Sequence, residues 1–221
     1  MFNAEQQLIT SLFANMFYWS RNTWNNGNTK YMGVPCLQCP MDMWVLHEVF
    51  FETRPNLIIE TGSALGASAL FYAHCLDNMS IPVDEGRIVS IDTQAWRAPI
   101  TEHERITFLK GMSVNPEIVA QVKAMAKPED RVMVILDSDH STENVLAELE
   151  TYHEMVTVGC YLIVEDTNLG GNPVHNMAEP GPGPMAAVNE FLAKNHMFEV
   201  DEWKERYFLT HYPRGWLRRI R

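Results

Sequence analysis

Residues 56–68 read NLIIETGSALGAS, and this stretch decides the fold. It begins as a continuous run of aliphatic side chains, turns at Gly62 and Gly66, and continues as a predicted helix. A buried strand, a glycine turn and a helix N-terminus together bring backbone N–H groups close to a ligand. The stretch differs from the GxGxxG dinucleotide motif, because Glu60 stands where the first glycine would be. A carboxylate at this turn repels phosphate and suits a ligand that carries an amine or another cation.

Apolar strands alternate with helices through the middle of the chain. The predicted strands are 56–62, 87–92, 106–111, 131–137 and 160–166, and the predicted helices between them are 67–76, 115–126 and 142–159. This alternation indicates βαβ units, and therefore a parallel sheet with helices on both faces. Such sheets bind ligands beyond the carboxyl ends of their strands. We expect one crevice to gather the acids that end four of the strands, which are Glu60, Asp92, Asp137 and Glu165.

Both ends of the chain carry further predicted elements. Helices are expected at residues 1–19, 41–55 and 185–195. Segments 197–203 and 206–213 are close enough in the sequence to pair as an antiparallel hairpin at the sheet edge. The last eight residues, RGWLRRIR, form the one basic cluster, and we interpret them as a solvated tail or, alternatively, as a patch for a partner or an anion.

The chain has 221 residues, of which 46% are hydrophobic, and this fits one α/β domain spanning residues 1–221. We divide it into N-terminal helices with a loop, at residues 1–54, and a core at residues 55–221. Two long loops that contain Gly and Pro, 21–40 and 167–184, are predicted to act as lids over the crevice.

The composition limits the partners and the location. The net charge of −11 argues against a nucleic-acid partner, because phosphate binding needs a basic surface. The sequence shows no signal-peptide pattern and no run of about 18 apolar residues, so we expect a cytoplasmic protein without membrane contact. The four cysteines are too scattered for a disulfide framework and are expected as free thiols. Cys36 and Cys39 have CxxC spacing, but no second pair completes a zinc site.

The segment LIVEDTN ends a predicted strand with two adjacent carboxylates, Glu165 and Asp166. With Asp137 at the end of the neighbouring strand, they offer three hard oxygen ligands, which suit Mg²⁺. Two alternatives remain open: Asp166 or Asn168 caps a turn, or Asp139 replaces Asp137 as a ligand.

The turn at Glu60 and the acid at the end of the next strand together favour a cationic nucleotide-type ligand. Asp92 lies where a carboxylate can accept both hydroxyls of a ribose. S-adenosylmethionine has such a ribose and carries an ammonium and a sulfonium, so it is the cofactor that this pair favours.

Four stretches resemble a known family: PMDMWVLHEVFFETRPNLIIETGSALGASALFYA, DSDHSTENVL, GCYLIVEDTN and GPGPMAAVNEFL. From about Trp24 to the C-terminus, the chain resembles class I methyltransferases, and most closely the family named after cephalosporin hydroxylase, whose members look like metal-dependent methyltransferases. The resemblance implies a Rossmann-like α/β fold with a mostly parallel seven-stranded sheet, helices on both faces and an antiparallel C-terminal hairpin.

Catechol-type O-methyltransferases are similar in their strand-end pattern, and this similarity implies residue roles. The predicted cofactor-binding residues are Glu60, Gly62, Ser63, Ser68, Asp92, Gly111, Ser113 and Asp137. The predicted metal ligands are Asp137, Glu165 and Asp166. The chain departs from the catechol-type pattern in two places: it has Glu165-Asp166 in place of Asp-Asn, and His140 in place of a lysine. The aromatic walls of the catechol site are not recognisable, so a catechol substrate does not carry over.

These observations predict an S-adenosylmethionine-dependent, Mg²⁺-assisted O-methyltransferase that acts on a hydroxyl of a small molecule, such as a sugar or a natural-product intermediate. The predicted catalytic residues are Asp137 and His140, with His140 as the general base or, alternatively, as a helix cap or partner of a nearby acid. An iron-dependent hydroxylase is one alternative, but no triad of two histidines and one carboxylate coincides with the strand ends. A non-catalytic nucleotide-binding protein is the other.

Four further residues are candidates for the substrate pocket. Trp24, Tyr31 and Trp96 could form its walls and His175 could face it, while packing or solvation are their alternative roles. The sequence identifies neither the methyl acceptor nor the pathway, and it is compatible with a homo-oligomer.

Overall fold

The computed structural model describes residues 3–20, 23, 28–94, 103–174 and 181–221. In these ranges no helix combines the length and the apolar character that crossing a membrane requires. All four cysteines are buried free thiols.

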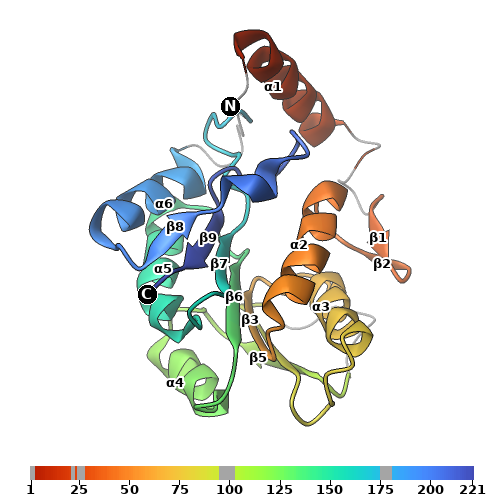
Figure 1. Ribbon diagram of the computed structural model, residues 1–221, viewed down its shortest axis with the longest axis vertical. Helices are drawn as coiled ribbons and strands as arrows, with labels where there is room; N and C mark the ends of the chain where they lie inside the picture. Colours follow the sequence, from red (N-terminus) through yellow and green to blue (C-terminus); the bar gives the residue numbers. More distant parts are fainter. Residues whose placement is uncertain (1–2, 21–22, 24–27, 95–102, 175–180) are drawn as a thin grey trace.

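A seven-stranded sheet forms the centre of the molecule (Figure 1). Its order from edge to edge is β5 (Ile106–Lys110), β4 (Arg87–Asp92), β3 (Leu57–Thr61), β6 (Val132–Leu136), β7 (Tyr161–Val164), β9 (Trp216–Arg219) and β8 (Phe198–Val200). The first five strands are parallel, and β9 runs antiparallel to both of its neighbours. The predicted α/β fold with a mostly parallel sheet and an antiparallel C-terminal hairpin is therefore confirmed.

Helices cover both faces of this sheet (Figure 1). On one face, α2 (Pro40–Thr53) and α3 (Ala67–Asn78) pack against Ile58, Ile88 and Ile135. On the other face lie α4 (Pro116–Met125), α5 (Thr142–Tyr152) and α6 (Gly183–Lys194). The central strands β3 and β6 are buried along their whole length, as expected for strands covered on both sides.

Local sequence signals start and stop these helices. Pro40 and Pro116 occupy the first helical positions of α2 and α4, where the missing N–H does no harm. Asn115 caps α4 and Ser141 caps α5, each by accepting a backbone N–H. α2 ends at Thr53, and the residue that follows, Arg54, has a left-handed backbone directly before a proline, which cannot continue the helix.

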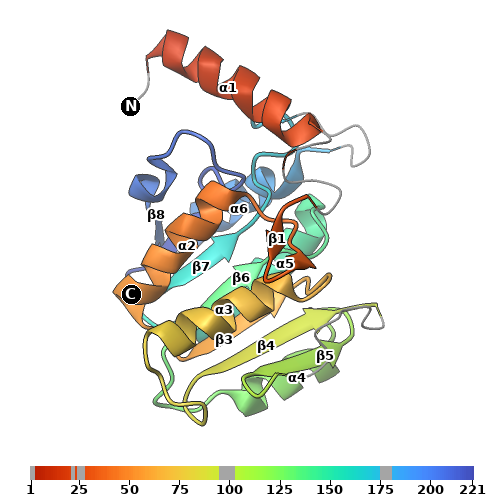
Figure 2. The ribbon, with the colours of Figure 1, turned by 90° about the vertical axis from the view of Figure 1, so that its right-hand side faces the viewer.

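The helix α1 (Ala4–Trp19) extends away from the sheet at one end of the molecule (Figures 1 and 2). A capping box between Asn3 and Gln6 starts it. Only Ala14 and Tyr18 are buried within its length. A two-stranded ribbon of β1 (Lys30–Tyr31) and β2 (Val34–Pro35) then leads into α2.

The C-terminal hairpin differs from the prediction in its second strand. Segment 206–213 is not a strand, and the short 3₁₀ helix Glu202–Glu205 precedes it. The basic C-terminus, predicted as a solvated tail or an anion patch, instead forms β9 in the interior of the sheet. Trp216 and Leu217 are fully buried and pack into opposite faces, which explains why a basic segment pairs as a core strand.

The predicted helix 142–159 was also too long. α5 ends at Tyr152, and the 3₁₀ turn His153–Met155 follows. The chain then turns at Gly159, where φ is +88°, a conformation that glycine adopts without strain.

Candidate active site

A cleft of about 840 Å³ opens at the carboxyl ends of the parallel strands. It lies beyond β3, β4, β6 and β7, which is the position where α/β sheets bind ligands. Five predicted cofactor residues line it, namely Gly62, Asp92, Gly111, Ser113 and Asp137. The sequence-based crevice and the observed cleft therefore coincide at these positions.

Gly62 is required by a close approach between two strand ends. Its φ is +88°, and a Cβ built on it would lie 1.6 Å from the backbone oxygen of Asp137. No other residue could take this conformation at this distance without moving β3 away from β6. The glycine thus holds Asp137 next to the turn that leads to α3.

Asp92 has a carboxylate that the backbone holds in place. One oxygen accepts the N–H of Ala64 at 3.0 Å, and the other accepts the N–H of Gln94 at 2.9 Å. Each carboxylate oxygen has a second lone pair, so Asp92 can still accept hydrogen bonds from a ligand in the cleft.

Three predicted cofactor residues lie beneath the cleft wall and do not line it. Glu60, Ser63 and Ser68 are buried. Ser63 and Ser90 share a hydrogen bond of 2.5 Å, and Ser90 donates in turn to Glu60. Burial raises the pKa of Glu60 to about 7, and its Oε1 has no hydrogen-bond partner among the described residues.

Ser113 lines the cleft, but its hydroxyl is already engaged. It donates to the carboxylate of Glu148, which also accepts the Ser138 hydroxyl at 2.6 Å. Glu148 is fully buried, and this burial raises its pKa. Sequence reasoning missed this residue, although an acid on the inward face of α5, beside Val145 and Tyr152, was a detectable signal.

Two of the predicted metal ligands, Asp137 and Asp166, line the cleft at the ends of β6 and β7, and the third, Glu165, is buried and does not line it. The Gln38 side-chain nitrogen donates to Asp137 at 3.0 Å and to Glu165 at 2.7 Å, so one amide group bridges the two carboxylates. The Tyr212 hydroxyl donates a hydrogen bond to the side-chain oxygen of Gln38 and thereby orients its amide group. Gln38 stands between the two CxxC cysteines, and nothing in the sequence indicated this role.

Burial and mutual repulsion oppose ionisation of this group. Burial, followed by the charges of Glu165 and Asp166, raises the pKa of Asp137 well above its usual range. Burial raises the pKa of Glu165 to about 8. Among the described residues no lysine or arginine pairs with them, and Glu165 Oε1 is buried without a hydrogen-bond partner. A group of carboxylates whose negative charge no neighbouring cation balances, and in which one oxygen lacks a hydrogen bond, fits a divalent cation.

Asp166 faces the cleft beside His140. The Nδ1 of His140 lies 3.2 Å from Asp166, and its Nε2 lies 3.9 Å from Asp137. One ligand atom from each of these three residues lies within 4.8 Å of the others. Asp166 has φ +53°, a left-handed backbone that aspartate tolerates better than most residues and that often marks functional sites.

Asp139, the alternative to Asp137, forms hydrogen bonds with a nearby serine. Its carboxylate accepts the N–H of Ser141 at 2.9 Å and the Ser141 hydroxyl, and these bonds lower its pKa. It is exposed at the start of α5 and outside the group formed by Asp137, His140 and Asp166.

The candidate pocket aromatics fall in other places. Tyr31 does not line the cleft, and its hydroxyl lies 2.8 Å from Nδ1 of His74 on α3. Trp24, Trp96 and His175 lie outside the described residues, as do parts of both predicted lid loops. Tyr18 and Leu37, which sequence reasoning did not select, contribute to the cleft wall.

Comparison with known proteins places this geometry in context. A family model described as Rhamnosyl O-methyltransferase/CmcI matches residues 22–220. A rhamnosyl O-methyltransferase of Mycobacterium leprae is 35% identical over 177 residues, which are 79% of this chain and 74% of that protein.

Solved structures of CmcI have a similar fold. The apo structure has a TM-score of 0.69 at 21% identity and covers 91% of this chain and 80% of that one. A CmcI structure with Mg and SAM has a TM-score of 0.66 at 19% identity, with 91% and 81% covered.

Proposed function

The chain belongs to the Rhamnosyl O-methyltransferase/CmcI family, and from this premise we propose that it methylates a hydroxyl of a sugar-type small molecule with the help of Mg²⁺. Membership identifies it as an S-adenosylmethionine-dependent O-methyltransferase. The observation that carries the proposal is that Asp137 and Asp166 line the same cleft as Asp92, with Glu165 joined to Asp137 through the Gln38 amide.

The cofactor would occupy the part of the cleft between the strand ends of β3 and β4. Asp92 would accept the ribose hydroxyls, since the backbone already fixes its carboxylate. Gly62, Gly111 and Ser113 would form the adjacent wall. Glu60 would act from beneath this wall, where its carboxylate favours the positive charges of the cofactor over a phosphate.

Asp137, Glu165 and Asp166 would hold Mg²⁺, because they supply hard oxygen donors without a balancing lysine or arginine among the described residues. When bound, the ion supplies charge that favours the deprotonated form of the acceptor hydroxyl. Gln38 would keep Asp137 and Glu165 at their present separation through its bridging amide.

His140 would take the proton from the acceptor hydroxyl. Its Nδ1 is within hydrogen-bond distance of Asp166, which assigns the ring proton to that nitrogen and leaves Nε2 to accept. Nε2 lies on the side of Asp137, at the end of β6. The cleft exposes about a fifth of the His140 side chain, so an acceptor can reach it.

The sugar-type acceptor is supported by the relatives, which are named rhamnosyl O-methyltransferases. The cleft suits such a molecule, because acidic, hydroxyl and amide side chains that can hydrogen-bond sugar hydroxyls line it together with apolar ones. The iron-dependent hydroxylase is less well supported, because the cleft group has one histidine and two aspartates, whereas that chemistry uses two histidines and one carboxylate.

Calorimetry and a methylation assay test the proposal. We expect S-adenosylmethionine to bind and NAD not to bind, and methyl transfer to a rhamnose-bearing acceptor to stop in excess chelator and return with Mg²⁺. With S-adenosylmethionine and Mg²⁺ both saturating, His140→Ala should lower the methylation rate about 10²-fold. Full activity in excess chelator would contradict the metal site, and an unchanged rate in His140→Ala would contradict the base.

A further inference from the structure

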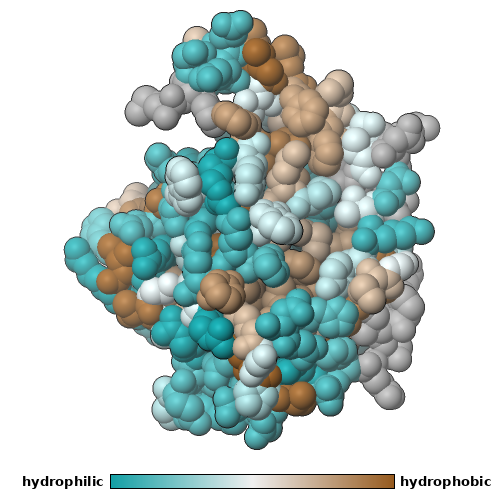
Figure 3. Space-filling view, turned by 45° about the vertical axis from the view of Figure 1, so that its right-hand side comes forward, coloured by the Kyte–Doolittle hydropathy of each residue, from teal (hydrophilic) through white to brown (hydrophobic). Residues whose placement is uncertain are grey.

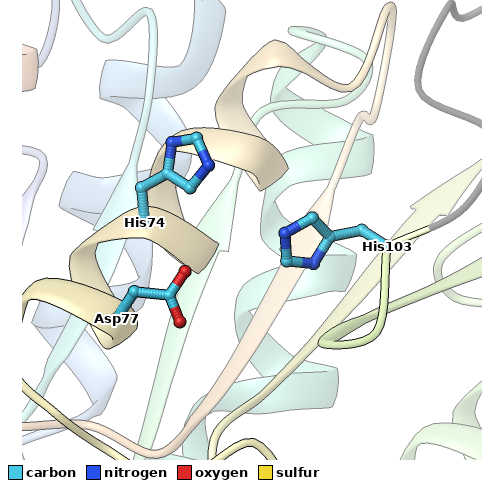
Figure 4. A group of neighbouring side chains, drawn as sticks. All are labelled: His74, Asp77 and His103. Carbon is cyan, nitrogen blue, oxygen red and sulfur yellow. The ribbon is translucent and has the colours of Figure 1, made fainter.

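A second group of metal-ligating side chains lies outside the cleft, on α3 and before β5. His74 and Asp77 are three residues apart on α3 and therefore share one helix face. His103 reaches toward them from the segment that enters β5 (Figure 4). One ligand atom from each residue lies within 4.8 Å of the others, and none of the three lines the cleft.

A tyrosine hydroxyl fixes the ring of His74. The Tyr31 hydroxyl lies 2.8 Å from Nδ1 of His74, which leaves Nε2 outside this bond. Histidines that bind metal ions usually have their other nitrogen held in this way. The partner comes from β1, so the orientation of the ring depends on a contact 43 positions apart in the sequence.

A buried arginine orients Asp77. Arg105 donates to Asp77 Oδ1 from Nε at 2.8 Å, and its other nitrogens donate to the carbonyl oxygens of Ile81 at 2.7 Å and Gly86 at 3.2 Å. The guanidinium is thus held mainly by backbone carbonyls, and its contacts with Asp77 use only Oδ1. Asp77 Oδ2 is left for a ligand, and the carboxylate is about half exposed.

The backbone before β5 positions His103. Ile106 donates its N–H to the His103 carbonyl at 3.0 Å, and the two residues form an isolated bridge. The Arg105 N–H approaches His103 Nδ1 at 3.2 Å, which is the long end of the hydrogen-bond range. Giving up this contact costs little, so either ring nitrogen can turn toward an ion.

We propose that His74, Asp77 and His103 bind a first-row transition-metal ion, with Zn²⁺ as the best match. Two imidazole nitrogens and one carboxylate oxygen suit Fe²⁺ as well as Zn²⁺ and are poor ligands for Mg²⁺, which prefers oxygen alone. Zn²⁺ is the better match of the two, because a given set of nitrogen and oxygen ligands binds it more tightly than Fe²⁺. The ion connects α3 to the segment that enters the edge strand β5. This site is independent of the proposed methyl transfer, and either can fail without the other.

Zinc titration of the full chain tests the site. Calorimetry in excess Mg²⁺ counts the zinc equivalents, and the same titration of His140→Ala, which removes the imidazole from the cleft group, identifies any equivalent that belongs to the cleft. The wild type should bind one equivalent that His74→Ala and His103→Ala lose. Because a ligand that binds only the folded state raises its stability, zinc should raise the thermal midpoint of the wild type more than that of these variants.

Matched variants separate ligation from folding. Asp77→Asn keeps the side-chain shape and Tyr31→Phe keeps the ring, yet each should weaken zinc binding at least about tenfold. His196→Ala removes an exposed histidine elsewhere and should bind as the wild type does. The proposal is overturned if the wild type binds no such equivalent, or if Asp77→Asn and Tyr31→Phe, both folded, bind zinc with wild-type affinity.

Discussion

At the scale of single residues, the close contact at Gly62 determines whether β3 and β6 can end side by side. The Cβ of Gly62→Ala would overlap the Asp137 carbonyl oxygen, at a position whose φ is +88°. We expect the variant to lose about 3 kcal/mol or more of unfolding free energy, measured by urea denaturation. Gly33→Ala is the matched control, because its φ is +85° but its Cβ would meet nothing within 4 Å. It should lose only about 1 kcal/mol, the cost of a left-handed alanine, and equal losses in the two variants would show that the overlap is relieved.

Gln38 supplies the hydrogen bonds that hold two repelling carboxylates together. Gln38→Ala removes its donors to Asp137 and Glu165, so these side chains should move apart, and Mg²⁺ affinity should fall about 10- to 100-fold. Titration calorimetry measures this loss directly, without an acceptor substrate. Leu37→Ala is the control, because Leu37 lines the cleft and is half exposed, and its apolar side chain can form no hydrogen bond with either carboxylate. If both variants lose affinity equally, the loop as a whole matters and the bridging amide does not.

At the scale of helices and strands, the sequence pattern predicted the central strands, which are buried on both faces of the sheet. β3, β4 and β6 were found because aliphatic side chains predominate in short segments, and the acids at their ends followed from the parallel arrangement. β9 was missed because two apolar residues between arginines are too few to show a strand pattern. Its burial depends on pairing with β7, which lies more than 50 positions earlier in the sequence. Gln38 was missed for the same reason, since its partners are set by tertiary contacts.

The exposed face of α1 is the other feature at this scale. Six large apolar side chains of this 16-residue helix are 41% to 63% exposed, namely Leu8, Ile9, Leu12, Phe13, Met16 and Trp19. Hydrophobic surface accordingly gathers over this end of the molecule in Figure 3. An apolar surface of this extent on one helix is typical of an interaction site.

The homo-oligomer with which the sequence is compatible would cover such a face, and we expect α1 to form its contact. Sedimentation velocity should show an oligomer for the wild type and a smaller species for the double variant Leu12→Glu, Met16→Glu, because buried charges at the contact oppose association. Gln7→Glu adds charge to an exposed polar position of the same helix and should leave the oligomer intact. A monomeric wild type at micromolar concentration would contradict this expectation.

At the scale of the whole molecule, the chain concentrates buried acids beneath its cleft while carrying a net charge of −11. Burial raises the pKa of Glu60 and of Asp42 to about 7. Asp42 lies at the start of α2, where it accepts the Thr210 hydroxyl at 2.6 Å and the His211 N–H at 2.7 Å. It thereby joins α2 to the segment before β9, so the folded state depends on acids that are costly to ionise in place.

This burial makes stability depend on pH in a predictable direction. Glu60 has an ordinary pKa of 4.5 and a folded value of about 7, so between these values the folded protein keeps a proton that the unfolded chain has released. Raising the pH through this window therefore favours unfolding, by on the order of 3 kcal/mol for this one group, and the effect levels off above pH 7.

Urea denaturation of the metal-free protein from pH 5 to pH 8 should show this decline in the free energy of unfolding. Glu60→Gln cannot ionise but can still accept the Ser90 hydroxyl, so its stability relative to the wild type should improve steadily across the window. Glu199→Gln, which changes an exposed acid on β8, should run parallel to the wild type, and a constant difference between Glu60→Gln and the wild type would show that Glu60 ionises in the folded state as easily as in the unfolded chain.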